Sequence, residues 1–208
     1  MRNALIVWGG WDGHQPKEVG EIFADVLRKE SFDVTVSDSL DAFADAELMA
    51  KQDLIVPVWT MGTITKEQLK PLLDTVSAGC GIAGCHGGMG DSFRNEVEFQ
   101  HMVGGQWVAH PGNDGVRYMV NMVSEDEPLT AGIGDFEVCS EQYYMHVDPA
   151  IKVHATTSFG DVAMPVVWTK TWGSGRVYYN SLGHQANIVA MPQTLELMRR
   201  GFLWAARG

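Results

Sequence analysis

Four of the seven histidines stand where a predicted strand ends beside a glycine or a proline; they are His14, His86, His110 and His184. An imidazole titrates near neutral pH and its neutral form binds metals. Glu141, in the segment Glu-Gln-Tyr-Tyr, is a carboxylate that can join them. We therefore expect one shared site, in which His86 and Glu141 act as general acid and base and His184 completes the catalytic group.

A divalent metal is a second use for the same residue types. Three neutral imidazoles, or two and a carboxylate, make a catalytic Zn²⁺ site with one position open. The candidate ligands are His14, His86 and His110. The chain has no closely spaced His pair such as HxH or HxxxH, so such a site must be assembled by the fold. A metal thus remains an alternative at this point, and no cofactor is required by the sequence.

The elements that must position these side chains follow from apolar periodicity. Short apolar runs at 4–8, 54–58 and 81–85, and the alternating segment at 32–36, predict strands. Pro57 suggests that pairing of the third strand ends there. One helix is predicted at 17–30, a second begins after the N-cap residue Thr65, and a third is predicted at 93–102. A loop is expected directly after the fourth strand. Further strands are predicted at 106–110, 115–123, 136–147, 151–158 and 164–181. A final helix is predicted at 192–205.

This order of elements predicts the fold class. Strands that alternate with helices indicate a parallel sheet covered on both faces, and the later strand-rich region adds antiparallel strands in the C-terminal half. We expect a doubly wound α/β fold in one domain that spans residues 1–208. In such sheets ligands bind outside the carboxyl ends of the strands, where the glycine-rich loops and their histidines fall.

Composition excludes several classes of function. The net charge of −11 argues against a nucleic-acid partner, because binding to phosphates needs clustered Lys and Arg. No apolar run approaches the ~18 residues that cross a bilayer, so we expect no membrane partner. Three cysteines without regular spacing make no disulfide framework, and we expect a cytoplasmic protein with reduced thiols. A P-loop motif is absent, and the glycines near residue 87 complete no dinucleotide fingerprint.

The segment Gly-Ile-Ala-Gly-Cys-His-Gly-Gly has the layout of a nucleophile elbow, in which a sharp turn after a strand projects one side chain. Either Cys85 or His86 can stand at the tip. A nucleophilic Cys85 needs a nearby base and a lowered pKa. We favour the simpler interpretation, in which Cys85 is the last inward residue of a buried strand and His86 is the exposed tip.

The chain resembles the ThuA-like (trehalose utilisation) family, within the class I glutamine amidotransferase-like superfamily of flavodoxin-like folds. The resemblance covers nearly the whole chain and rests on a series of segments in order: GIAGCHGG at 81–88, MVGG at 102–105 leading to AHP at 109–111, PLTAGI at 128–133, EQYY at 141–144, PVVWT at 165–169, GSGRVYY at 173–179 leading to SLGH at 181–184, and GFLWA at 201–205. Amidotransferases carry Cys at the elbow tip, whereas the aligned residue here is His86. The resemblance therefore does not imply glutamine hydrolysis.

The family is associated with disaccharide and keto-sugar metabolism, so the resemblance implies a small carbohydrate as substrate. We expect an enzyme that moves a proton next to a carbonyl, with isomerisation or cleavage as the result. Two alternatives stay open: a sugar-binding or assembly subunit without catalysis, and a hydrolase that depends on Cys85. Candidate substrate-binding residues are Trp11, His14, Trp59, Gly87, Arg94 and His110.

Several of these residues have an equally plausible structural role. The rings of Trp8, Trp11 and Trp59 can face a sugar or pack in the core, and Arg94 can bind a hydroxyl or anionic group or point into solvent. Proteins of this size often form symmetric homo-oligomers, and we expect one here. The late aromatic residues are either its interface or part of the core, and they are Trp168, Trp172, Tyr178 and Tyr179.

Overall fold

The computed structural model describes residues 1–124 and 127–208. Its strands are β1 (Arg2–Gly10), β2 (Phe32–Ser37), β3 (Leu54–Thr60), β4 (Gly81–Cys85), β5 (Gly105–Ala109), β6 (Val116–Met122), β7 (Phe136–Ser140), β8 (Tyr144–Val147), β9 (Lys152–Phe159), β10 (Val162–Trp172) and β11 (Gly175–Asn180). Its helices are η1 (Asp12–His14), α1 (Pro16–Lys29), η2 (Leu40–Ala44), α2 (Ala46–Met49), α3 (Lys66–Ser77), α4 (Gly87–Gly90), α5 (Val97–Val103), α6 (Ala186–Val189) and α7 (Pro192–Ala205). None of the helices in these described ranges is long and apolar enough to span a membrane.

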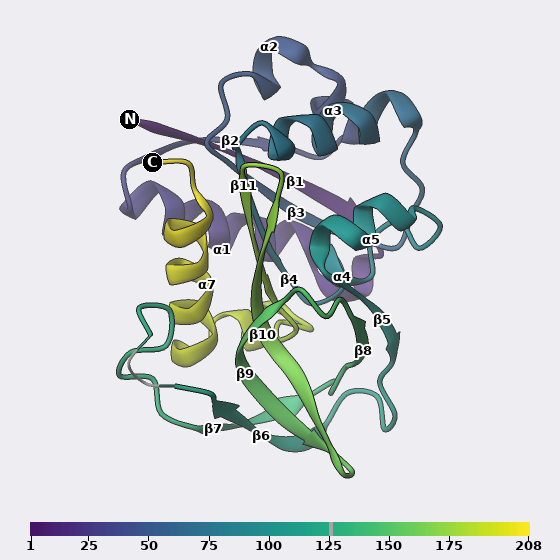
Figure 1. The fold of residues 1–208 in the computed structure, drawn as a ribbon, viewed down its shortest axis with the longest axis vertical. Coiled ribbons are helices and arrows are strands. Elements are labelled where there is room, and N and C mark those ends of the chain that lie inside the picture. Colours follow the sequence, from purple (N-terminus) through teal and green to yellow (C-terminus); the bar gives the residue numbers. More distant parts are fainter. Residues whose placement is uncertain (125–126) are drawn as a thin grey trace.

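One long sheet organises the described residues, in the order β2-β1-β3-β4-β11-β10-β9-β6-β7 (Figure 1). The first five strands of this order are parallel neighbours. The last four continue the sheet in antiparallel pairs, and β5 and β8 form a separate small sheet. This arrangement confirms the predicted doubly wound α/β fold with added antiparallel strands in the C-terminal half.

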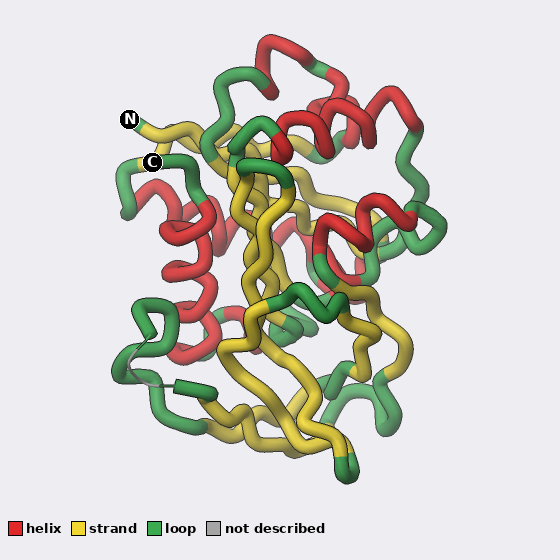
Figure 2. Tube along the Cα trace, in the orientation of Figure 1, coloured by secondary structure: helices red, strands yellow, loops and turns green. Residues whose placement is uncertain are grey.

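Helices cover both faces of the parallel part of the sheet. On one face, α1 and α7 pack together through Phe23 and Phe202, whose ring centroids lie 5.1 Å apart. On the other face, α3 and α5 bury Leu72 and Phe99 in a second apolar cluster. Figure 2 shows that the helices gather around this part, whereas the far end of the sheet consists of strands and loops. The carboxyl ends of the parallel strands therefore meet the strand-rich region.

The structure corrects the expectation that pairing of the third strand ends at Pro57. Pro57 lies opposite Val7, and the pairing of β3 with β1 continues as far as Thr60. On its other edge, β3 pairs with β4 only through Leu54 and Ile55. Proline has no N–H to donate, so pairing is lost on one edge of the strand while the other edge continues.

Three element boundaries also differ from the predictions. The predicted loop after the fourth strand contains the short helix α4, and the helix predicted at 93–102 begins at Val97 as α5. The strand predicted at 136–147 is two strands, because residues 141–143 leave the sheet between β7 and β8. This break matters for function because it frees Glu141 and Tyr143 from regular pairing.

The aromatic residues late in the chain belong to the core. Trp168, Tyr178 and Tyr179 are fully buried, and the Trp168 indole donates to the backbone carbonyl of Val103 at 2.9 Å. Trp172 is half-buried and donates to the Leu73 carbonyl at 3.3 Å. Trp168, Tyr178 and Tyr179 are therefore core residues, whereas Trp172 packs against the core with part of its ring exposed.

The N-terminus of α3 allows a test of local stability. The Thr65 side chain accepts from the Gln68 amide while the Gln68 side chain accepts from the Thr65 amide, which forms a capping box. We expect Thr65→Ala to lower the free energy of unfolding by about 1 kcal/mol, measured by urea denaturation. Thr63→Ala, two residues upstream at an exposed position without a cap contact, is the matched control. Equal losses in both variants would contradict a capping role for Thr65.

Candidate active site and metal centre

The candidate site lies where the parallel strands end. His14 follows β1 in the helix η1, Thr60 ends β3, His86 follows β4, and His184 follows β11. Parallel strands of one sheet share their carboxyl edge, so residues distant in sequence meet there. Glu141 reaches the same place from the strand-rich region, directly after β7. His14, His86 and His184 therefore lie close to Glu141 at the carboxyl edge of the sheet.

His86 stands at the tip of a sharp turn. Its backbone adopts φ 48° and ψ −140°, which is strained for any residue except glycine. The turn is held from both sides, because the His86 amide donates to the Asn180 carbonyl at 2.7 Å and the Tyr179 hydroxyl donates to the His86 carbonyl at 2.9 Å. A Cβ on Gly90 would lie 2.2 Å from that hydroxyl, so glycine is needed there. The elbow layout expected from the sequence is thus formed with His86 at its tip. The expectation that this tip is exposed is wrong, because the cluster around His86 buries it to 1% exposure.

Cys85 is the last residue of β4 and is buried in the core. Burial raises the pKa of its thiol to about 12. A thiol at such a pKa supplies almost no thiolate near neutral pH. The position therefore suits a packed core residue, and the environment of Cys85 argues against the Cys-dependent hydrolase.

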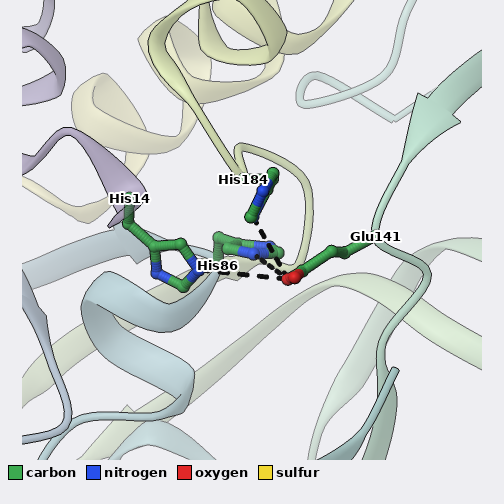
Figure 3. A group of neighbouring side chains, drawn as sticks. All are labelled: His14, His86, Glu141 and His184. Atoms are coloured by element: carbon green, nitrogen blue, oxygen red, sulfur yellow. Dashed lines mark hydrogen bonds and ion pairs between the residues drawn. The ribbon is translucent and has the colours of Figure 1, made fainter. Parts of the chain in front are cut away.

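The Glu141 carboxylate is the centre of the cluster (Figure 3). Its Oε2 lies 3.1 Å from His86 Nε2, 3.2 Å from His184 Nδ1 and 3.9 Å from His14 Nε2. Its other oxygen, Oε1, lies 3.8 Å from His110 Nε2. All of these side chains are buried except His110, which is 28% exposed. One carboxylate is thereby surrounded by four imidazoles.

In His86 and His14, the ring nitrogen that points away from Glu141 makes a hydrogen bond. This bond orients the other ring nitrogen, which faces the carboxylate. His86 Nδ1 lies 2.8 Å from the Ser181 carbonyl, which can only accept, so Nδ1 carries the proton. A neutral His86 then presents the lone pair of Nε2 to the carboxylate. His14 Nδ1 is likewise held by Thr60 Oγ1 at 2.8 Å, which leaves Nε2 facing the cluster. A second hydrogen bond of this kind commonly orients a metal-binding histidine.

The electrostatics of the site keep two of the rings, those of His14 and His86, neutral. Burial, together with the neighbouring His86 and His184, lowers the pKa of His14 to about 3. Burial also lowers the pKa of His86, although contact with Glu141 opposes this effect. For Glu141, burial would raise the pKa, but the interactions with His184 and His86 hold it below its ordinary range. Near neutral pH the carboxylate is therefore an anion that faces the neutral rings of His14 and His86.

The donor set fits a divalent cation. One ligand atom from each of His14, His86, Glu141 and His184 lies within 4.8 Å of the others. His184 Nδ1 is buried and makes no hydrogen bond to the described residues, despite its nearness to Glu141. Nitrogen and carboxylate ligands in this number suit Zn²⁺ and similar metals. His110, expected as a ligand from the sequence, lies outside this group, and His184 and Glu141 take its place.

A cavity of about 360 Å³ opens beside the cluster. Four of the predicted binding residues line it, namely Trp11, His14, Arg94 and His110. It is also lined by residues that the sequence did not single out, notably Asp91, Trp107 and Tyr143. Tyr143 stands in the noted segment Glu-Gln-Tyr-Tyr, but only the break between β7 and β8 brings it to the site.

Two predicted binding residues, Trp59 and Gly87, are absent from the described lining of this cavity and make packing contacts beside it. The Trp59 ring packs against Gly9 and Gly62, where an added Cβ would lie 2.5 and 2.6 Å from it, and it is absent from the described lining of the cavity. Trp8 packs in the core beside α1. A Cβ on Gly87 would lie 2.6 Å from the His14 ring. Gly87 therefore makes room for a candidate ligand and does not itself line the cavity.

Arg94 is held rigidly at the edge of the cavity. Its Nε and Nη2 donate to the two carboxylate oxygens of Asp91 at 2.6 and 2.8 Å. Its guanidinium lies over the Trp107 ring, 4.7 Å from the centroid. Asp91 is buried and Arg94 is largely exposed. This pairing orients a planar donor toward the cavity and balances its charge.

Fold and site together define a flavodoxin-like, class I glutamine amidotransferase-like protein with His in place of Cys at the elbow. The family model described as trehalose utilisation matches residues 3–205. The chain therefore belongs to the ThuA family. No curated protein matches the sequence.

Solved structures share the fold at low sequence identity. A ThuA-like protein from Parabacteroides merdae has a TM-score of 0.81 and 17% identity, covering 98% of this chain and 89% of that chain. A ThuA-like protein from Bacteroides uniformis has a TM-score of 0.81 and 16% identity, covering 98% and 91%. A β-galactosidase from Bacillus circulans sp. alkalophilus has a TM-score of 0.62 and 14% identity, covering 99% of this chain but 32% of that chain. At these identities the similarity establishes the fold.

The buried histidines predict how stability depends on pH. The pKa of His14 is about 3 in the folded protein, against an ordinary value of about 6.5 for a solvated histidine, so the unfolded chain binds more protons between these values. The contribution is complete above pH 6.5 and is lost as the pH falls toward 3. We expect the free energy of unfolding of metal-free protein to fall by up to about 1.4 kcal/mol per pH unit for each such histidine.

Urea denaturation between pH 7.5 and 5 measures this slope. His14→Asn should make the slope shallower, because one buried imidazole no longer resists protonation. His146→Asn removes an exposed histidine of β8 and is the matched control. If His14→Asn and His146→Asn both kept the wild-type slope, burial of His14 would not be its cause.

Proposed function

We propose that this ThuA-family protein is a metal-dependent enzyme that acts on a sugar or keto-sugar. The observation that carries the proposal is the convergence of three imidazole nitrogens and a carboxylate oxygen within 4.8 Å, with His184 Nδ1 lacking a hydrogen-bond partner. Lone pairs that face a buried anion repel one another unless a cation lies between them. A divalent ion held by His14, His86, Glu141 and His184 would satisfy all four groups at once.

A bound divalent cation would supply Lewis acidity toward a carbonyl or hydroxyl oxygen of the substrate. The chain itself supplies the groups that orient the substrate and move the proton. His110 suits the second task, because it is the most exposed histidine of the cluster and lines the cavity. Its Nε2 lies near Glu141, while its buried Nδ1 has no hydrogen-bond partner among the described residues. In this proposal His86 and Glu141 serve as ligands, and proton transfer passes to His110.

The shape and lining of the cavity support a carbohydrate as substrate. Trp11 and Trp107 offer aromatic faces, and Arg94 with Asp91 offers a fixed donor and acceptor. Pockets that combine apolar faces with a few oriented polar groups select small polar molecules. The family description, trehalose utilisation, points to the same class of substrate.

The first experiment measures metal content. We expect wild-type protein, purified and exchanged into metal-free buffer, to retain about one divalent ion per chain by plasma mass spectrometry. Glu141→Gln and His184→Ala should each weaken retention at least about tenfold in competition with a chelator, because each removes one ligand. His101→Asn, an exposed histidine on α5 outside the cluster, is the control. Retention by none of the proteins would refute the metal centre.

The second experiment tests turnover. Wild type and His86→Ala are screened against 3-keto-glycosides and their parent disaccharides, with and without chelator. We expect wild type to convert at least one compound, and His86→Ala and chelated protein to lose that activity by roughly 100-fold or more. Binding without conversion by wild type would favour the alternative of a non-catalytic sugar-binding subunit.

A further inference from the structure

We propose that the Tyr143 hydroxyl is a hydrogen-bond donor to the bound carbohydrate. This inference rests on the proposed function, because it places a substrate in the cavity beside the metal centre. Tyr143 lines that cavity and is only 3% exposed. It follows Glu141 by two residues, in the break between β7 and β8.

The ring of Tyr143 is fixed by its neighbours. It stacks on the His86 imidazole, with centroids 3.9 Å apart and planes 26° apart. The His110 ring lies nearly parallel to it at 6.0 Å, and Trp107 lies at 6.3 Å. A ring held among three aromatic neighbours has little freedom to turn. The hydroxyl therefore has one fixed position in the cavity.

That hydroxyl has no protein partner within the described residues. Tyr118, Tyr178 and Tyr179 each donate to a backbone carbonyl, at 3.0, 2.8 and 2.9 Å. The Tyr143 hydroxyl donates to none, although it is close enough to Asp91 and Arg94 to interact with them electrostatically. Tyr143 lines the cavity, and its hydroxyl is not among the fully buried side-chain atoms that lack a partner in the described residues. The hydroxyl is therefore open to the cavity and free to donate to a ligand oxygen there.

The position of the hydroxyl suggests which part of the substrate it meets. Three of the candidate metal ligands, His14, Glu141 and His184, line the cavity, and Asp91 and Arg94 line it as well. A sugar that presents one oxygen to the metal side has further hydroxyls a few ångströms along its ring. We assign Tyr143 to one of these oxygens, together with Arg94, so that it orients the ring and selects among sugars.

Tyr143→Phe removes the hydroxyl and keeps the ring that stacks on His86. Tyr144→Phe is the matched control, because that neighbouring tyrosine is half-buried against Phe159 and is absent from the described lining of the cavity. Binding of methyl 3-keto-glucopyranoside is followed by tryptophan fluorescence, since Trp11 and Trp107 line the cavity. Metal content is measured on the same samples.

We expect both variants to keep the wild-type metal content, and only Tyr143→Phe to bind the probe about 3- to 10-fold more weakly. A series of monodeoxy derivatives of the probe sharpens the test. One derivative should bind wild type more weakly by a similar factor and bind Tyr143→Phe no more weakly than the parent probe, because the partner oxygen is already unpaired. A purely structural role for Tyr143 would affect all derivatives equally.

The outcomes separate the two proposals. If wild type binds the probe and Tyr143→Phe binds it as tightly, the assignment of Tyr143 is wrong while the proposed function stands. If Tyr143→Phe loses metal as well as affinity, the hydroxyl supports the ligands and the assignment is equally wrong. If wild type binds neither the probe nor any of the screened sugars, the proposed function fails and the assignment fails with it.

Discussion

The contact between the Glu141 carboxylate and the histidine nitrogens around it is the interaction on which the rest of the site depends. Ser181 and Thr60 hold the far side of His86 and His14, and burial keeps these rings neutral. The near nitrogen of His86 then faces a buried anion as an acceptor. Such an arrangement is stable on its own only at a considerable electrostatic penalty. The rest of the fold must offset this penalty, because the groups come from distant parts of the chain and are held in place by the strands that carry them.

The fold provides this arrangement by joining two kinds of sheet. The parallel strands deliver His14, His86 and His184 to one edge, as any doubly wound sheet delivers its loops. The antiparallel extension brings Glu141 to the same edge from the opposite side, and the small β5–β8 sheet positions His110. A protein with only the parallel part would hold the imidazoles without the anion. The strand-rich region is thus part of the site.

Much of the fold was predictable from local patterns, and the site was predictable in part. The apolar run of β4 and the helical spacing of α7 fall at the expected residues, because burial alone decides them. The helix α4 was missed because its sequence is mostly glycine, and its contacts with β3 rather than its propensity hold it. The choice of His184 over His110 as a neighbour of Glu141 Oε2 depends on distances across the sheet, which spacing does not encode. Tyr143 was missed because a tyrosine in a strand-like segment gives no sign that the strand breaks there.

Replacement of Cys by His at the elbow changes what the same backbone can do. A cysteine at the strained tip is presented as a nucleophile, and it needs a nearby base to become a thiolate. At this position His86 instead presents a nitrogen lone pair, and the nearby groups are a carboxylate and two further imidazoles. The strain that aims a nucleophile in one case aims a candidate metal ligand in the other. The elbow is therefore best understood as a device for fixing one side chain rigidly at the end of a strand, and the residue at its tip, with the groups around it, decides the chemistry.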